Sequence, residues 1–292
     1  MRSQKIQFAI FPSWRQVLPL LLLMVVFRVP TAHGTPIFLD RFEKKALPDS
    51  AVALMRSGKY EEARSELMKW LEKKPDSHAT LVMLGYVEAE LNNWDQALAS
   101  MKQAILLAPE DQRDDLRVDL ANIQAAKGDK AEALGLFDEL LARHPSHARA
   151  LFYSATLLRD AGKNEAAIAN YQRVLALDPN HGKALLALIQ VHLQEGRTEE
   201  AIALSRRLQT ANPQSDQGYY WEAVAHLRKP EAKPDTAIKL LNQALEKNPA
   251  NDSTVLLLSM LSLKGGNVEE ARRMIHNRLQ SRQGPQKPGE MR

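Results

Sequence analysis

The residues with the greatest potential for chemistry are a few histidines, and none of them lies in a recognised catalytic or metal-binding motif. His144 and His147 flank Pro145, but neither a third histidine nor a carboxylate follows them at a spacing typical of metal ligands. The chain has no Cys, which excludes disulfides, thiolate catalysis and Cys-ligated zinc. We interpret both histidines as solvated loop residues and expect no metal and no cofactor.

Adjacent carboxylates are a second candidate for acid and base chemistry. Glu61-Glu62, Glu199-Glu200 and Glu269-Glu270 each stand just before an alanine. Neighbouring residues of a helix point to different sides, so such a pair cannot converge on one substrate. At the start of a helix, however, negative charge complements the positive end of the helix dipole. We therefore expect these carboxylates to be structural.

The composition favours an all-helical protein with no general attraction to polyanions. Aromatic residues make up only 6% of the 292 residues, and β-branched residues do not form the alternating runs typical of strands. The formal net charge is +4, but the first 34 residues hold four basic residues and no acidic one. The remainder has 39 − 4 = 35 basic and 35 acidic residues. This balance argues against nucleic acid or anionic lipid as a partner.

Residues 1–34 have the layout of a secretory signal peptide. Basic residues precede the apolar run Val17–Phe27, which is followed by the small-residue sequence Ala32-His33-Gly34. The run has 11 residues, whereas a membrane-spanning helix needs about 20. We expect cleavage after Gly34 and an exported protein, periplasmic or secreted. The alternative is an uncleaved signal anchor, supported by the apolar residues 8–11, with the rest of the chain outside the cytoplasm and the leader as its only membrane contact.

Beyond the leader, the chain repeats with a period close to 34 residues. The prolines that mark the period are separated by 34 or 36 residues: Pro75, Pro109, Pro145, Pro179, Pro213 and Pro249. Twelve residues before each stands an alanine: Ala63, Ala97, Ala133, Ala167, Ala201 and Ala237. Proline cannot continue a helix and closes the second helix of each unit. Alanine allows two helices to approach closely.

Three further columns of the repeat complete a helix-turn-helix unit. Turn formers that tolerate a left-handed backbone stand between the helices: Gly58, Asn92, Gly128, Gly162 and Gly196. Small residues on the first helix face the alanine column: Ala51, Gly85, Ala121, Ala155 and Ala223. Larger residues follow the alanine by four positions: Leu67, Met101, Phe137, Tyr171 and Leu241. Ile189 and Ser205 break the last two columns, which makes the fifth unit the most irregular.

Segments such as Gly58-Lys-Tyr-Glu-Glu-Ala63 and Gly196-Arg-Thr-Glu-Glu-Ala201 resemble tetratricopeptide repeats. The resemblance implies an all-α, right-handed α-solenoid of about seven helix-turn-helix units over residues 44–285. The units begin near Lys44, His78, Asp114, Ala148, Gly182, Asp216 and Asp252. Residues 35–43 form an N-terminal extension, and residues 286–292 are expected to be a disordered tail.

The resemblance also implies that the first helix of each unit lines a concave inner groove, which is the expected binding surface. Projection of these helices predicts the following inner-face residues: Tyr86, Asn122, Arg149, Phe152, Arg159, Lys183, Gln190, Gln194, Tyr220 and Arg228. Aromatic and cationic groups suit an extended peptide or a polar polymer. Some relatives grip a C-terminal carboxylate with Lys and Asn one turn apart. Here Val118 precedes Asn122, so that clamp is not expected.

The favoured function is a non-enzymatic exported scaffold that binds a protein partner in a cell-envelope assembly, of the polysaccharide-export, pilus or secretion, or cytochrome-maturation type. An enzyme is disfavoured because the leader and the repeats leave 16 residues, too few for a catalytic domain. The alternative is carbohydrate binding, with Tyr86, Phe152 and Tyr220 stacking on sugar rings and a polysaccharide as the partner.

Overall fold

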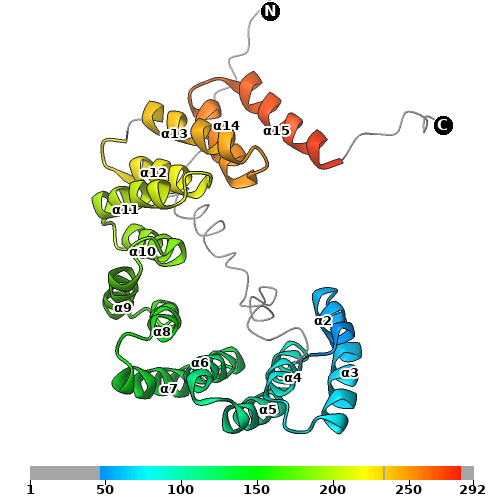
Figure 1. Ribbon diagram of the computed structural model, residues 1–292. Helices are drawn as coiled ribbons and strands as arrows, with labels where there is room; N and C mark the ends of the chain where they lie inside the picture. The colour runs from blue at the N-terminus through cyan, green and yellow to red at the C-terminus, as the bar shows by residue number, and fades with distance from the viewer. Residues whose placement is uncertain (1–46, 233, 284–292) are drawn as a thin grey trace, which may run out of the picture.

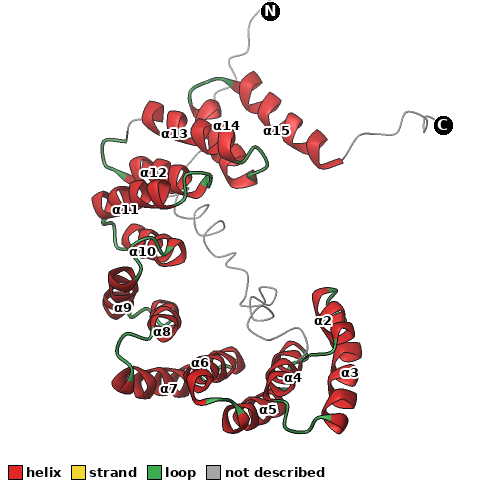
Figure 2. Ribbon diagram, in the orientation of Figure 1, coloured by secondary structure: helices red, strands yellow, loops and turns green. Residues whose placement is uncertain are grey.

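The computed structural model describes residues 47–232 and 234–283, which form only helices and the loops between them (Figure 2). The helices come in seven pairs: α2 (Asp49–Arg56) and α3 (Tyr60–Lys73), α4 (His78–Glu90) and α5 (Trp94–Leu107), α6 (Glu110–Lys127) and α7 (Lys130–Arg143), α8 (Ala148–Asp160) and α9 (Asn164–Leu177), α10 (Gly182–Gln194) and α11 (Thr198–Ala211), α12 (Gln217–Arg228) and α13 (Pro234–Lys247), α14 (Asp252–Lys264) and α15 (Val268–Gln283). Each pair is one repeat unit.

The units stack in chain order into a curved row (Figure 1). Every helix contacts the next one along the chain, and the first helices of neighbouring units also meet, as α4 with α6, α6 with α8, and α8 with α10. The first helices α4, α6 and α8 lie on the inside of the curve, and α5, α7 and α9 lie outside them (Figure 1). We call the inner side the concave face. The predicted all-α solenoid is confirmed.

The alanine and small-residue columns lie where the helices of each unit touch. The six alanines from Ala63 to Ala237 are completely buried, and Ala271 continues the column in α15. Gly85 shows why the facing column is small, because a Cβ placed there would lie 3.2 Å from the Ala97 carbonyl oxygen. Helix backbones at this separation leave no room for a longer side chain. The predicted register is therefore confirmed.

The predicted turn residues adopt the left-handed backbone that reverses the chain. Gly58, Gly162 and Gly196 have φ between 73° and 75°, and Asn92 has φ 61° in the same position. The sixth turn differs, since α12 ends at Arg228 and α13 begins at Pro234. Proline suits the first position of a helix, where its missing N–H would have no partner within the helix.

Two predicted unit boundaries are wrong. The first helix of the first unit, α2, begins at Asp49 rather than near Lys44. The third unit begins with α6 at Glu110 rather than near Asp114, so this helix is one turn longer than expected. Pro109 occupies the N-cap position, and the acidic residues Glu110 and Asp111 fill the first turn. The proline that closes α5 thus also starts α6, which accounts for one of the 36-residue spacings.

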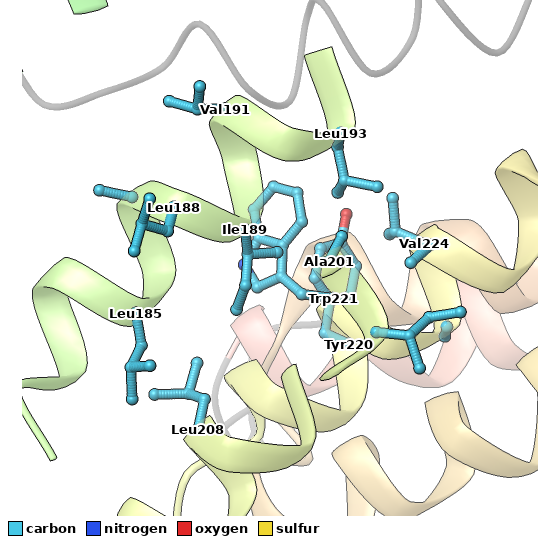
Figure 3. Packing of buried hydrophobic residues seen from close by; sticks show 14 of the residues in the cluster. Leu185, Leu188, Ile189, Val191, Leu193, Ala201, Leu208, Tyr220, Trp221 and Val224 are labelled. Atoms are coloured by element: carbon cyan, nitrogen blue, oxygen red, sulfur yellow. The ribbon is translucent and has the colours of Figure 1, made fainter. Parts of the chain in front are cut away.

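The irregular fifth unit exchanges large and small residues between columns. Ile189 occupies the small column and Ser205 the large one, and both are fully buried. Ile189 lies with Ala201 and Trp221 in one apolar cluster (Figure 3). Ser205 donates a hydrogen bond to the Ala201 carbonyl at 2.7 Å, which satisfies the hydroxyl within its own helix.

The leader, the extension at 35–43 and the tail at 286–292 lie outside the described residues. Within residues 47–232 and 234–283, no helix is long and apolar enough to cross a membrane.

Candidate partner-binding face

The ten residues predicted for the inner face differ widely in exposure. Lys183 and Gln194 are exposed, whereas Tyr220 is buried. The other seven are half-buried: Tyr86, Asn122, Arg149, Phe152, Arg159, Gln190 and Arg228. A side chain that binds a partner must be reachable and must have polar groups left to offer, so exposure and existing contacts separate these residues.

Arg149 is held by carboxylates of the preceding unit. Its guanidinium donates to Asp115 Oδ1 at 2.6 Å and to Asp119 Oδ1 at 2.6 Å, and Asp119 is only 1% exposed. Burial by itself lowers the pKa of Arg149, but Asp119 and Asp115 together outweigh it and raise the pKa above its ordinary value. The ring of Tyr153 lies 5.9 Å from the guanidinium carbon. Arg149 thus acts first as a bridge between α6 and α8.

Phe152 and Arg159 are also engaged within the fold. The Phe152 ring packs edge-on to Tyr153 and Tyr171, with centroid distances of 5.5 Å and 5.7 Å, and lies 5.4 Å from the His181 ring. Arg159 pairs with its neighbour Asp160 at 2.9 Å. These contacts lie in the middle of the solenoid. They leave only part of each side chain accessible to a ligand.

Tyr220 is a core residue and not a stacking platform, which corrects its predicted placement on the inner face. It is 6% exposed and packs edge-on to Trp221 at a centroid distance of 5.3 Å (Figure 3). Burial raises the pKa of its hydroxyl to about 12. A ring in this position cannot stack on a sugar, so the carbohydrate alternative loses one of its three aromatic residues.

Four polar side chains on two neighbouring first helices remain available, and we call them the polar surface of α10 and α12: Lys183, Gln190, Gln194 and Arg228. Arg228 donates to the Leu193 carbonyl at 2.6 Å, close to the end of α10. Burial lowers the pKa of Arg228, and no carboxylate within the described part of the chain pairs with it. Lys183 likewise makes no ion pair among these residues. This surface offers two cations to an acidic group.

The loop histidines have structural roles, so their interpretation as solvated residues is wrong for His147. His147 Nδ1 accepts a hydrogen bond from the Ala150 amide at 3.2 Å, and His181 Nδ1 accepts from the Ala184 amide at 3.1 Å. Each thus caps the start of a first helix, as serine does elsewhere. His144 Nε2 lies 2.9 Å from Asp114 Oδ2 of the preceding unit. No group of three metal-ligating residues occurs in residues 47–232 and 234–283.

The sequence did not reveal a small hollow between the second and third units. It has a volume of about 280 Å³. Its lining combines apolar and charged side chains: Lys102, Ile105, Leu106, Arg117, Leu120, Leu136, Glu139 and Arg143. Glu139 lies 3.6 Å from Arg143, and Arg117 lies 2.5 Å from Asp114. The lining residues come from α5, α6 and α7, and they are not among the columns that mark the repeat.

Comparison with known proteins identifies the repeat independently of its geometry. Two family models, both described as tetratricopeptide repeat, match residues 49–113 and 118–161, and residues 158–227 and 231–286. No curated protein matches the sequence.

Solved structures of the same fold include a tetratricopeptide repeat protein from Parabacteroides merdae, with a TM-score of 0.56 at 20% identity over 68% of this chain and 78% of that one. PilW, a widely conserved type IV pilus biogenesis factor, gives a TM-score of 0.57 at 18% identity over 72% of this chain and 96% of that one. PilF of Pseudomonas aeruginosa gives 0.55 at 17% identity over 68% and 88%. At identities this low, the structural likeness shows a shared fold and no more.

Proposed function

Because the chain belongs to the tetratricopeptide repeat family, whose members generally bind other proteins without catalysing a reaction, we propose that it is a scaffold that binds an acidic, extended segment of a protein partner. The observation that carries the proposal is the polar surface of α10 and α12. Arg228 is a half-buried cation without a carboxylate partner in the described residues. Burial removes part of the hydration of the Arg228 guanidinium. An ion pair with a carboxylate of the partner would compensate for that loss.

The amide side chains support an extended segment as the ligand. Gln190 and Gln194 lie one turn apart on α10, and each offers a donor and an acceptor to a peptide backbone. Lys183 stands at the other end of the same helix. Acidic residues along the partner can therefore meet a cation at each end, with backbone groups between them. A sugar polymer would gain less, because Tyr220 is buried.

The proposed setting is a cell-envelope assembly outside the cytoplasm. The signal-peptide layout of residues 1–34 supports it, and so does the presence of a type IV pilus biogenesis factor among proteins of the same fold. N-terminal sequencing of the protein recovered from cells should find Thr35 as the first residue. An intact Met1 in the membrane fraction would instead establish a signal anchor.

The binding surface can be tested by reversing the charge of one of its two cations and removing that of the other. In-cell crosslinking of a Lys183→Glu, Arg228→Gln variant should lose the partners that the natural protein captures, since a few residues carry most of the energy of an interface and their loss costs about 2 kcal/mol or more each. A Lys239→Glu, Lys247→Gln variant makes the same charge change on the exposed side of α13 and should capture partners normally. Equal capture by both variants, at unchanged melting temperature, would exclude this surface.

A further inference from the structure

The C-terminal end of the solenoid carries an uncovered apolar surface. Nine large apolar residues of the described chain are exposed, and five of them belong to the last unit. They lie on α14 and α15: Leu256, Leu263, Val268, Ile275 and Leu279. Figure 1 shows α15 at the end of the row, with no further helix of the described chain beyond it. Exposed apolar groups concentrated in this way mark an interaction surface.

The position of Ile275 on α15 lacks the burial that the same position has in the other units. It follows Ala271 by four residues, so it occupies the column of large residues, whose members in the six preceding units are Leu67, Met101, Phe137, Tyr171, Ser205 and Leu241. Those six are at most 1% exposed, whereas Ile275 is 40% exposed. Ala271 is buried, so α15 is seated on α14 as in the other units. What differs is that no following first helix of the described chain covers this side of α15.

The N-terminal end has the complementary gap. Ala53 on α2 is exposed, although its column is buried in all six later units, at no more than 7% exposure. Its equivalents are Val87, Ile123, Leu157, Val191, Ala225 and Leu261. Ser50, one turn earlier on α2, is exposed too. Small residues at both positions leave room for the larger side chains of an approaching helix. The helix α2 therefore presents the uncovered face of a first helix. Within the described chain, a first helix is what is missing beside α15.

The charges at the two ends match as well. Inside the solenoid, ion pairs link the start of a second helix to the turn of the next unit: Asp95 with Lys127 at 3.2 Å, Glu199 with Lys229 at 2.6 Å, and Glu165 with Arg197. Glu269 occupies the column of Glu165, two residues before the alanine. Lys59 occupies the column of Arg197, one residue after the turn glycine. The last unit thus holds the acid, and the first unit the cation, of one more such pair.

From these observations we propose that a second copy of this chain docks head to tail, with its α2 on the outer face of α15. Ile275 and Leu279 pack against Ser50 and Ala53 of the second copy, and Glu269 pairs with the second copy's Lys59. The contact is heterologous, so it leaves one end of each kind free and continues the solenoid as an open chain of copies. The concave face then runs on from one copy to the next.

Sedimentation velocity of the protein as recovered from cells, over a range of concentrations, tests the association. The natural protein should form dimers and then longer species as its concentration rises. Ile275→Asp with Leu279→Asp should weaken association by at least about 30-fold, because two apolar side chains lose their burial. Leu106→Asp with Leu177→Asp removes two apolar side chains that are exposed elsewhere and should leave association unchanged. A natural protein that stays monomeric at every concentration would overturn the proposal.

Mixing experiments distinguish head-to-tail docking from pairing of two identical ends. Ala53→Glu blocks only the α2 end, and the Ile275, Leu279 variant blocks only the α15 end. Each alone should be monomeric, while their mixture should form a dimer that grows no further. Dimers of the Ala53→Glu variant alone would show tail-to-tail pairing and contradict the proposal. Glu269→Lys should weaken association about two- to fivefold, the size of an exposed ion pair, and Lys59→Glu should restore it; failure of this rescue would refute the predicted register.

Discussion

At the scale of single residues, the contacts that a side chain already makes decide whether it can serve a partner. Arg149 and Arg228 have the same chemistry and both come from first helices. Arg149 is neutralised by Asp115 and Asp119, whereas within residues 47–232 and 234–283 the partner of Arg228 is a backbone carbonyl. Two arginines that the sequence places in one group therefore have different roles: the first connects units, and the second is available to an acid.

Arg149→Ala should destabilise the protein, because it leaves the charge of the buried Asp119 without its nearest compensation. We expect a loss of about 1–3 kcal/mol, below the roughly 3–5 kcal/mol of a fully buried pair, since Arg149 is partly exposed. Urea unfolding measures it. Arg272→Ala breaks the exposed pair with Glu269 and should cost less than about 1 kcal/mol. Similar losses for the two variants would show that Arg149 has no special structural role.

Tyr220 makes stability depend on pH in the alkaline range. Its pKa is raised to about 12 by burial, while in the unfolded chain it is about 10. The folded state therefore binds this proton more tightly, and the stabilisation is present below pH 10 and is lost as the pH rises toward 12. The natural protein should lose about 2–3 kcal/mol more than Tyr220→Phe over this interval, measured by denaturation at each pH. Parallel pH profiles of the two proteins would contradict the assignment.

At the scale of helices, the distance between packed helix backbones differs from one pair of helices to another. Gly218 at the start of α12 lies against α11, where a Cβ would come within 2.9 Å of the Gln209 amide nitrogen and 3.0 Å of the Ser205 carbonyl oxygen. Gly135 in α7 has nothing within 4 Å of the same position. Both glycines are helical, so the helix propensity of alanine favours replacement at either site, and only packing separates them.

Gly218→Ala should destabilise the protein by about 1–3 kcal/mol, because backbone atoms on α11 must move to admit the methyl group. Gly135→Ala should stabilise it by about 0.5–1 kcal/mol, the gain in helix propensity. Thermal and chemical denaturation of both variants give the signs directly. Two stabilised proteins would mean that α12 does not approach α11 as closely as described.

At the scale of the whole molecule, the core is distributed unevenly along the solenoid. The largest apolar cluster extends from Leu151 in α8 to Leu261 in α14, and a second one holds the first three units together. In α15, by contrast, Ala271 is the only buried apolar residue. In a linear array each unit is stabilised mainly by its neighbours, so a terminal unit with one neighbour opens first.

Native-state hydrogen exchange should therefore find the amides of α15 exchanging fastest among the described helices and those of α9–α11 exchanging slowest. At a concentration at which the protein is monomeric, the difference reflects local opening alone. Raising the concentration should then slow exchange in α2 and α15 while α9–α11 stay unchanged, if the two ends dock on each other. Uniform exchange along the solenoid would contradict a linear stability gradient.

The sequence by itself determined the repeat, its register and most helix boundaries, because those depend on contacts inside one period. Alanine, glycine and proline columns report close packing, left-handed turns and helix ends directly, and neighbouring units reproduce them. The early start of α6 could not be predicted from the sequence. A proline after a helix can also begin the next helix, as Pro109 does, and the spacing of the prolines does not show which of them do so.

Only the tertiary structure decided which inner-face residues are available. The partners of Arg149 lie 34 and 30 residues earlier, and that of Arg228 lies 35 residues earlier. Such contacts join neighbouring units through side chains that vary from unit to unit, so no column of the repeat records them. Tyr220 likewise became a core residue because it packs into the apolar cluster that α10, α11 and α12 form together. The repeat period specifies how each helix is placed. The charge and volume of side chains one unit apart decide which polar side chains remain available to bind a partner.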